Sequence, residues 1–321
     1  MRKAFQKQLA GTMRIQPLPV KQTVLVTGAN GQVGRNICKV FDDSFDVVGF
    51  SSHALDVGDA AAIQKIFDVV KPDIVINAAA YTKVDDAEIH SELAQRTNFH
   101  AVKYLCEACL NHNSLLVHFS TDYVFDGVAT RPYVEEDRAN PLNAYGRSKL
   151  AGDHYIIENA DQYLIFRLAW VYDSSGTNFP KKILQAAKVK DQLTVVDDQI
   201  GTPTSADFIA NTVHQFIALK DTSKKPGFNG LYNLVPNDVA SWFEFSIRLL
   251  SRAGDMGFDL KCKARDVIPI KSSRLSQLAK RPQQVVLDNQ QIQQALGIRF
   301  APWDAYIDDF LEQLRQQNDK I

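Results

Sequence analysis

The chain has 321 residues, of which 45% are apolar and 23% are charged, an ordinary composition for a globular protein. Lys and Arg total 36 and Asp and Glu total 37, so the formal net charge of −1 favours binding neither to nucleic acid nor to a membrane surface. No apolar run approaches the ~20 residues of a membrane-spanning helix. Four cysteines are too few for a disulfide framework in a chain of this length, so we expect a cytoplasmic protein with reduced thiols.

The first 22 residues differ in composition from the rest of the chain. They contain five bases, Arg2, Lys3, Lys7, Arg14 and Lys21, and no acid. Polar residues interrupt the apolar stretch that a secretory signal peptide would need. We interpret residues 1–22 as a flexible basic leader outside the fold, with an organelle transit peptide as the alternative.

From Thr23 onward, short apolar runs alternate with segments of helical periodicity. The expected strands cover residues 23–27, 45–50, 73–77, 115–119 and 163–168. The expected helices cover residues 33–41, 60–70, 91–111 and 145–159. Strands and helices that alternate at this spacing predict an α/β fold with a doubly wound, Rossmann-like parallel sheet.

We predict two folded parts after the leader. Residues 23–172 are expected to form the Rossmann-like dinucleotide-binding domain. Beyond Trp170 loops interrupt the alternation, and the later helices are isolated from one another. No Pro- or Ser-rich linker separates the two parts. We therefore expect residues 173–321 to form mainly a smaller C-terminal substrate-binding lobe, packed directly on the first domain.

A glycine-rich loop follows the first expected strand. Residues 27–34 read TGANGQVG, which places Gly28, Gly31 and Gly34 between a strand and the start of a helix. Glycines here allow a tight turn, a close approach of the backbone to a pyrophosphate, and close packing of helix on sheet. The free N–H groups at the helix start can then bind the diphosphate of a dinucleotide. A role in packing alone is the alternative interpretation.

The end of the second expected strand bears on the choice between NADH and NADPH. An acid at this position binds the ribose hydroxyls of NAD and repels the additional phosphate of NADP. Residues 49–53 read GFSSH, without an acid, so NADPH is allowed and slightly favoured. Asp56 lies near the spacing of such an acid, and the alternative for Asp56 is a cap of the following helix.

Tyr145 and Lys149 are four residues apart at the start of an expected helix, so they lie on one helix face. The tyrosine can give a proton to a carbonyl oxygen, and the nearby ammonium brings the phenol pKa toward neutral pH. Thr121, just after the fourth expected strand, can hydrogen-bond the same carbonyl, or its hydroxyl can bond the local backbone instead. Active groups of open α/β sheets lie at the carboxyl ends of strands. We therefore predict that Thr121, Tyr145 and Lys149 form a catalytic site.

Several segments together are similar to the dTDP-4-dehydrorhamnose reductase family. They read TGANGQVG, INAAAYTKVDDAE, STDYVFDG, YGRSKLAGD, RLAWVY and DDQIGTPT, with a late KRP at 280–282. The resemblance covers nearly all of residues 23–314. It implies an extended short-chain dehydrogenase/reductase that uses NADPH or NADH to reduce the 4-keto group of dTDP-4-dehydro-L-rhamnose to give dTDP-L-rhamnose.

The resemblance also implies roles for individual residues. Tyr145 is the proton donor and Lys149 binds the cofactor ribose, while Thr121, Asp122 and Trp170 contact the substrate. The implied cofactor residues lie in three turns: Gly28, Gly31, Gln32, Val33 and Gly34 at the diphosphate, Asp56 and Val57 at the adenine, and Ala80, Tyr81 and Thr82 near the nicotinamide.

One position departs from the family pattern. Some family members are dimers bridged by magnesium, with a glutamate two residues after the last glycine of the loop. This chain has Asn36 there, so we expect no metal, and the chain can be a monomer or a homodimer.

Three alternative functions remain open on the sequence. Another nucleotide-sugar 4-ketoreductase or an epimerase would share the same motifs. A non-catalytic dinucleotide-binding subunit similar to the regulatory subunit of methionine adenosyltransferase is the third.

Cys106, Cys109 and His112 resemble a metal site, but we interpret the cysteines as core residues. Tyr306, Phe310 and Leu314 repeat at helical spacing and indicate a terminal helix docked on the core.

Overall fold

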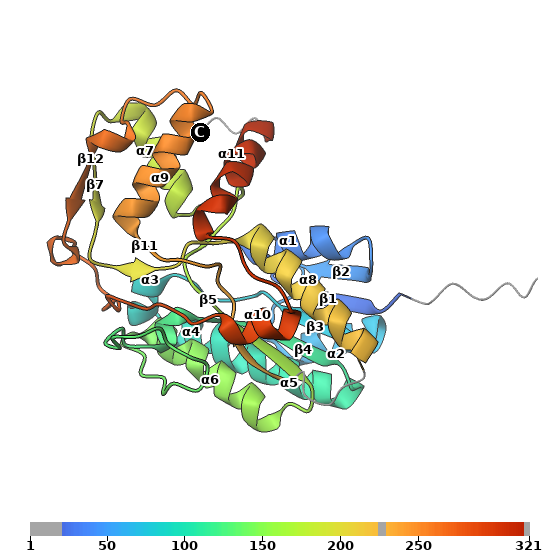
Figure 1. The fold of residues 1–321 in the computed structure, drawn as a ribbon. Helices are drawn as coiled ribbons and strands as arrows, with labels where there is room; N and C mark the ends of the chain where they lie inside the picture. Colours follow the sequence, from blue (N-terminus) through green and yellow to red (C-terminus); the bar gives the residue numbers. More distant parts are fainter. Residues whose placement is uncertain (1–20, 224–228, 318–321) are drawn as a thin grey trace, which may run out of the picture.

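A six-stranded, all-parallel sheet forms the centre of the larger lobe (Figure 1). The computed structural model describes residues 21–223 and 229–317. Residues 1–20 of the predicted leader lie outside the described residues. From one edge to the other the strands are β10 (Gly230–Asn233), β5 (Tyr163–Leu168), β4 (Leu115–Thr121), β3 (Ile74–Asn77), β1 (Thr23–Thr27) and β2 (Asp46–Phe50).

The strand order reverses between β1 and β3. The chain passes from β1 to β2 in one direction, then crosses back so that β3 pairs with the other side of β1. At such a switch point the loops at the carboxyl ends of the two central strands diverge and leave a crevice, which is where open α/β sheets bind ligands. The sheet topology therefore places a candidate site at the ends of β1, β3 and β4.

Alternate residues of the strands pack against two separate helical layers. In β1, Val24 and Val26 belong to the hydrophobic cluster on one face, whereas Leu25 belongs to the cluster on the other. Both faces are covered, so the strands are mostly apolar and do not alternate regularly with polar residues. The first face is covered by α1 (Gln32–Phe41), α8 (Ala206–Ser223) and α10 (Gln290–Leu296), and the second by α2 (Ala60–Val70), α5 (Ala101–His112) and α6 (Ala144–Asn159).

Polar caps and prolines define several helix ends. The Asp59 carboxylate accepts hydrogen bonds from the first N–H groups of α2, which ends at a left-handed Lys71 before Pro72. Asn143 caps α6 by accepting from the Gly146 N–H. Asp56 is therefore not the cap of α2, which corrects the alternative raised for it, because Asp59 occupies that position.

The smaller lobe consists of helices around a short two-stranded sheet (Figure 1). Its core is an aromatic and aliphatic cluster to which Tyr172, Phe245 and Phe310 contribute. Its elements are α7 (Phe179–Val189), β7 (Leu193–Val196), α9 (Trp242–Asp255), β12 (Val267–Ile270) and α11 (Ile307–Gln316). Two small ladders lie between the lobes, β6 (Val171–Tyr172) with β9 (Thr204–Ser205), and β8 (Ile200–Gly201) with β11 (Ala240–Ser241).

The chain returns to the larger lobe after residue 172. Helix α8 packs beside α1, and β10 adds the edge strand next to β5. Residues 173–321 were expected to form mainly the smaller lobe, and the sequence did not indicate which of their elements return to the larger one. The four residues of β10 read GLYN, which is too short and too polar a run to stand out as a strand.

Two further details differ from the expected elements. The helix predicted over residues 91–111 is composed of α4 (Ser91–Gln95), a π-helical segment (Arg96–His100) and α5. A short helix that was not predicted, α3 (Val84–Ile89), precedes it, and 3₁₀ turns occur at Asp122–Val124, Ala264–Asp266, Ser272–Arg274 and Trp303–Tyr306.

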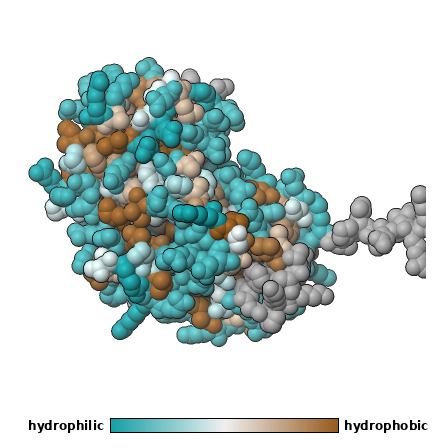
Figure 2. All heavy atoms as spheres, viewed as in Figure 1, coloured by the Kyte–Doolittle hydropathy of each residue, from teal (hydrophilic) through white to brown (hydrophobic). Residues whose placement is uncertain are grey.

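The polarity of the surface and the length and polarity of the helices are those expected from the ordinary composition. Most of the face in Figure 2 is hydrophilic, and apolar atoms gather where the two lobes meet and in smaller patches. Within the described ranges, no helix has both the length and the apolar character that crossing a bilayer requires. The terminal helix docks as predicted, because Phe310 and Leu314 are buried in the core of the smaller lobe.

Candidate active site

The glycine loop between β1 and α1 lies directly against the loop that follows β3. Gly28 has a φ of +66°, and a Cβ on it would stand 2.6 Å from the Ala79 nitrogen. A Cβ on Gly34 would stand 2.3 Å from the Gly28 oxygen, so α1 can pack this closely on the loop only with glycine there. Gly31 is the N-cap of α1 and is exposed, without a side chain that caps the helix. The start of α1 therefore presents backbone N–H groups that can donate hydrogen bonds to a diphosphate.

The loop after β3 is held by a residue of the π-helical segment. The buried Asn98 side chain accepts a hydrogen bond from the Tyr81 N–H (2.8 Å) and donates to the Tyr81 oxygen (3.0 Å) and to the Ser148 hydroxyl (3.0 Å). The Tyr81 hydroxyl donates to Asp86. π-helical segments often occur at functional sites, and this one ties the loop after β3 to α6.

Thr121, Asp122 and Tyr145 meet at the end of β4. The strand extends to Thr121, two residues beyond the predicted end, so Thr121 is its last residue. The Thr121 hydroxyl donates to Asp122 Oδ1 (3.0 Å), accepts from the Tyr123 N–H (3.2 Å) and lies near the phenol of Tyr145. The local backbone bond raised as one alternative for this hydroxyl is therefore present, and its contact with a substrate carbonyl stays a prediction.

The protonation states of this group suit proton donation. Burial raises the pKa of the Tyr145 phenol, the Thr121 hydrogen bond lowers it, and the carboxyl group of Asp122 raises it again. The phenol therefore carries its proton at neutral pH, and its raised pKa corrects the expectation that the Lys149 ammonium brings it toward neutral pH. Burial also raises the pKa of Asp122 to about 7.

Lys149 lies one turn further along α6 and is almost fully buried. Its Nζ donates to the Phe119 oxygen (2.6 Å) and lies 3.1 Å from His118 Nε2. Burial lowers the Lys149 pKa to about 8, while the Asp153 carboxylate raises it. Sequence reasoning identified Lys149 but neither His118 nor Asp153, since neither residue belongs to a recognisable spacing motif.

Trp170 stands at the junction of the two lobes. Its φ of +45° is unusual for a residue with a side chain. Its ring stacks on Trp242 of α9 at 3.5 Å and 6°, and a Cβ on Gly201 would collide with it. The tryptophan pair therefore forms one wall between the larger and smaller lobes.

Arg281 reaches the site from the late KRP segment. Its guanidinium donates to both carboxylate oxygens of Asp85, at 3.3 and 2.7 Å, and hydrogen-bonds the Tyr123 side chain. Tyr123 in turn lies edge-on to Tyr145, with ring centroids 5.7 Å apart. The segment was noticed in the sequence for its resemblance alone, and its contact with the site depends on folding.

In the turn after β2, the expected Asp56 is paired with Arg96, a residue that was not identified from the sequence. The Asp56 carboxylate accepts from the Arg96 guanidinium (2.6 Å) and from the Gly58 N–H (2.9 Å). The Arg96 hydrogen bond holds the Asp56 pKa below its usual value. Ser52 and His53 at the end of β2 are exposed, so their polar groups are free to meet a ligand.

Asn36 joins the two lobes. Its buried amide Nδ2 donates to the Gln32 oxygen (2.8 Å) and to Asp173 Oδ1 (3.0 Å), and Asn178 donates to Gln32 Oε1 (2.8 Å). Among the described residues, no group of three or more His, Cys, Asp or Glu side chains is arranged to hold a metal ion. Cys106 and Cys109 lie in the core between α5 and the sheet, as predicted.

We expect activity to be independent of divalent metal. Magnesium prefers carboxylate oxygens, and Asn36 offers only an amide at the position concerned. Turnover and molecular mass, measured with and without EDTA, are expected to be the same. Loss of activity on chelation, with recovery on adding magnesium, would contradict the prediction.

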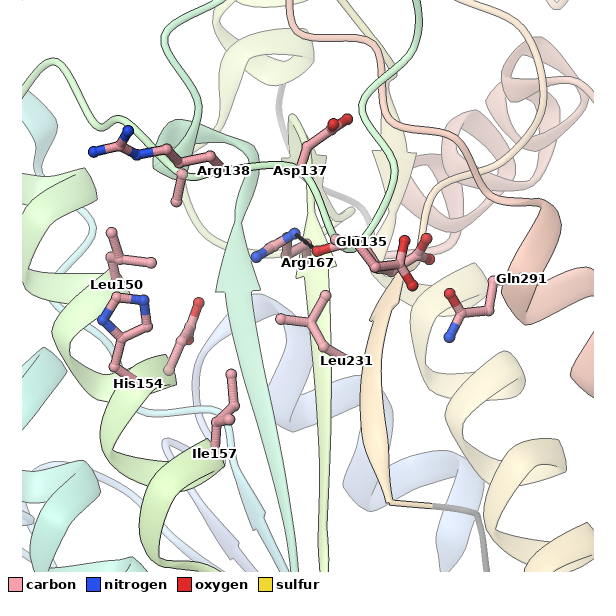
Figure 3. A pocket seen from close by; sticks show the side chains of 12 residues that line it. Glu135, Asp137, Arg138, Leu150, His154, Ile157, Arg167, Leu231 and Gln291 are labelled. Carbon is pink, nitrogen blue, oxygen red and sulfur yellow. Dashed lines mark hydrogen bonds between the residues drawn. The ribbon is translucent and has the colours of Figure 1, made fainter.

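A cavity of about 620 Å³ lies between α6, β5, β10 and the loop at 135–139, with Asp153 among its lining residues. Figure 3 shows His154 of α6 and Leu231 of β10 on its walls, with the Arg167 guanidinium hydrogen-bonded to the Glu135 oxygen (3.0 Å). Thr121, Tyr145 and Lys149 do not line it. We therefore place the candidate active site at the carboxyl edge of the sheet rather than in this cavity.

A parallel sheet with a glycine loop at its switch point, and a Tyr-x-x-x-Lys pair beside the end of the fourth strand, defines an extended short-chain dehydrogenase/reductase. Residues 22–316 match the family model described as RmlD substrate binding domain. The chain belongs to the dTDP-4-dehydrorhamnose reductase family.

Individual relatives agree with this assignment. The dTDP-4-dehydrorhamnose reductase of Aggregatibacter actinomycetemcomitans is 37% identical over 286 residues, which cover 87% of this chain and 95% of the relative. The enzyme of the same name from Escherichia coli K12 is 33% identical and covers 91% and 97%. The crystal structure of the Bacillus anthracis str. Ames enzyme in complex with NADP matches with a TM-score of 0.83 and 30% identity, covering 92% of this chain and 100% of that one.

Proposed function

We propose that this protein reduces the 4-keto group of dTDP-4-dehydro-L-rhamnose to give dTDP-L-rhamnose, with NADPH or NADH as the reductant. The observation that carries the proposal is the placement of the Thr121 hydroxyl, at the end of β4, beside the protonated phenol of Tyr145, one helical turn from Lys149. Membership of the dTDP-4-dehydrorhamnose reductase family supports the substrate.

The glycine loop supports a dinucleotide. Side chains at Gly28 and Gly34 would fill the space between the loop and its neighbours, so the backbone itself forms the cradle. Gly31, Gln32 and Val33 are proposed to bind the diphosphate with these glycines. A reduced nicotinamide supplies hydride to the keto carbon when it is bound.

The remaining cofactor contacts are proposed for the turns at the same edge of the sheet. Asp56 and Val57 would contact the adenine, and Ala80, Tyr81 and Thr82 would border the nicotinamide. Lys149, which donates to the Phe119 oxygen, would bind the ribose hydroxyls with its remaining donors.

The protein's own groups supply the proton and the orientation. The Tyr145 phenol gives its proton to the carbonyl oxygen as the carbon gains hydride, so the ketone becomes an alcohol and Tyr145 a phenolate. Thr121 hydrogen-bonds the same oxygen and polarises the carbonyl. The phenolate regains a proton before the next turnover. Asp122 and Trp170 are proposed to hold the sugar.

The test is to incubate purified protein with NADPH or NADH and a panel of nucleotide-linked 4-keto sugars. We expect oxidation of the cofactor and a 4-hydroxy product with dTDP-4-dehydro-L-rhamnose. An epimerase would interconvert sugars without net oxidation of added cofactor, and a regulatory subunit would bind cofactor without turnover. Either result would contradict the proposal.

We expect NADPH to be used at least as well as NADH. The end of β2 carries no acid, and the Arg35 guanidinium, hydrogen-bonded to the Asn30 oxygen of the glycine loop, adds positive charge there. Steady-state kcat/KM for both cofactors measures the preference. A strong preference for NADH would mean that another group, with Asp56 the nearest acid, reads the ribose.

We also infer a cytoplasmic location, and a monomer or homodimer that binds neither nucleic acid nor a membrane. The balanced charge and the few cysteines support this inference. Cell fractionation and the molecular mass in solution test it.

A further inference from the structure

A buried chain of polar side chains runs beneath Lys149 from the end of β1. The Thr27 hydroxyl donates to Asn77 Oδ1 (2.7 Å), Asn77 Nδ2 contacts His118 Nδ1 (3.1 Å), and His118 Nε2 lies 3.1 Å from Lys149 Nζ. All of these side chains are at most 2% exposed. Buried polar groups are almost always hydrogen-bonded, so the donor and the acceptor in each of these contacts can be assigned.

The orientation of Asn77 determines the tautomer of His118. The Ala79 N–H can only donate, and it points at Asn77 Oδ1 (3.2 Å). Asn77 therefore presents its NH₂ group to His118, and His118 Nδ1 must be the acceptor. In a neutral imidazole the other nitrogen then carries the hydrogen, so Nε2 is an N–H donor aimed at Lys149.

The charge state of Lys149 follows from that donor. An ammonium has donors only, so it cannot accept from the His118 N–H, whereas a neutral amine can accept from His118 and still donate to the Phe119 oxygen. We propose that His118 is a positioning residue whose Nε2–H favours the neutral amine form of Lys149 in the cofactor-free protein and thereby lowers the pH at which Lys149 takes up a proton. Protonation would weaken the contact with His118 and release Lys149 toward its proposed partner, the cofactor ribose, so this consequence rests on the proposed function.

Other charged groups also face Lys149. Asp153, one turn along α6, is buried and accepts from the Ser120 hydroxyl, while its Oδ1 lies 3.8 Å from His118 Nε2 and has no hydrogen-bond partner among the described residues. Its carboxylate favours the ammonium. Arg167 of β5 acts on Asp153 from the opposite side, and the phenol of Tyr145 lies on the same face of α6 as Lys149. His118 itself stays neutral, because its complete burial lowers its pKa.

Two substitutions of His118 distinguish the effect of its N–H group from the effect of its size. His118→Gln keeps an N–H donor near the Nε2 position, and His118→Phe removes it, while both remove the acceptor for Asn77. The Lys149 titration is followed in the cofactor-free protein by NMR of ¹³C-labelled lysine, with the signal assigned by Lys149→Met. His214→Phe makes the same change at a half-buried histidine that packs on Phe41 and serves as the matched control.

Replacing His118 and replacing Asp153 are expected to shift the Lys149 pKa in opposite directions. His118→Phe removes the opposing N–H and offers a ring face to the ammonium, so we expect the Lys149 pKa to rise by about one unit, tenfold in proton affinity. His118→Gln and His214→Phe are expected to leave it near the native value of about 8. Asp153→Asn removes the carboxylate and is expected to lower it.

The outcomes divide clearly. Equal shifts in His118→Phe and His118→Gln, or no shift in either, would overturn the inference. If His118→Phe does not fold, ¹⁵N NMR of the native protein still tests the tautomer of His118. A hydrogen on Nδ1 instead of Nε2 would also overturn the inference. The pH dependence of the NADPH Kd tests the proposed function separately. If the NMR shifts occur but the Kd does not follow them, the role of Lys149 in cofactor binding is wrong and the role of His118 stands.

Discussion

Tyr145→Phe is expected to lower kcat by about 10²–10⁴-fold, the usual contribution of a positioned acid, while NADPH binds almost as tightly as before. The substitution keeps the ring, which packs beside Tyr81 against a small cluster of alanines and edge-on to Tyr123. It removes the only atom that can give a proton to the carbonyl oxygen from this ring. Steady-state turnover and a fluorescence titration with NADPH measure the two effects separately.

The matched control for this prediction is Tyr155→Phe on the same helix. The Tyr155 hydroxyl donates to Glu107 (2.9 Å) on the exterior and touches no residue of the candidate site. We expect this variant to retain near-native turnover. A Tyr145→Phe enzyme as active as the control would remove Tyr145 from the proposed chemistry.

The elements that the sequence predicted best are those with clear punctuation. The strand at 23–27 ends in the glycine loop, and the helix at 60–70 is bounded by Asp59 and Pro72, so the bounds expected for both agree with the structure. The order of the strands does not follow from the alternating pattern, because right-handed crossovers allow β3 to lie beside either β1 or β2.

Elements that depend on distant contacts were predicted poorly. The π-helical segment at Arg96–His100 has ordinary helical composition, and its geometry depends on Asn98 bonding both the Tyr81 backbone and Ser148. Strand β10 exists because β5 offers it an open edge, and nothing in its four residues indicates that partner. Local periodicity does not report such tertiary effects.

The same distinction applies to the site. Thr121, Tyr145 and Lys149 could be found because strand ends and an i, i+4 pair are local patterns. Distant neighbours of the site could not be found, since Trp242 and Arg281 come from segments more than 70 residues away from Trp170 and Tyr123, which they contact. His118 reads as one more alternating strand residue, and only its buried contacts with Asn77 and Lys149 set it apart.

Gly34→Ala is expected to weaken cofactor binding about tenfold or more and to lower the free energy of unfolding by about 1–3 kcal/mol. The new Cβ would lie 2.3 Å from the Gly28 oxygen, 2.8 Å from the Gly28 carbonyl carbon and 3.0 Å from Ala29 Cα, all backbone atoms. No side chain can rotate away, so α1 must move off the loop, and its N–H groups then lose their alignment with the diphosphate.

Gly254→Ala is the matched control for Gly34→Ala, because Gly254 is also helical but has no atom within 4 Å of an added Cβ. Alanine is the better helix former, so we expect the control to keep or slightly raise stability, by less than ~1 kcal/mol, and to leave NADPH binding unchanged. Thermal unfolding and NADPH titration of the two variants in parallel measure the difference. If Gly34→Ala behaves like Gly254→Ala, the helix does not need its close approach to the loop, and the glycine loop cannot be the diphosphate cradle that the proposed function requires.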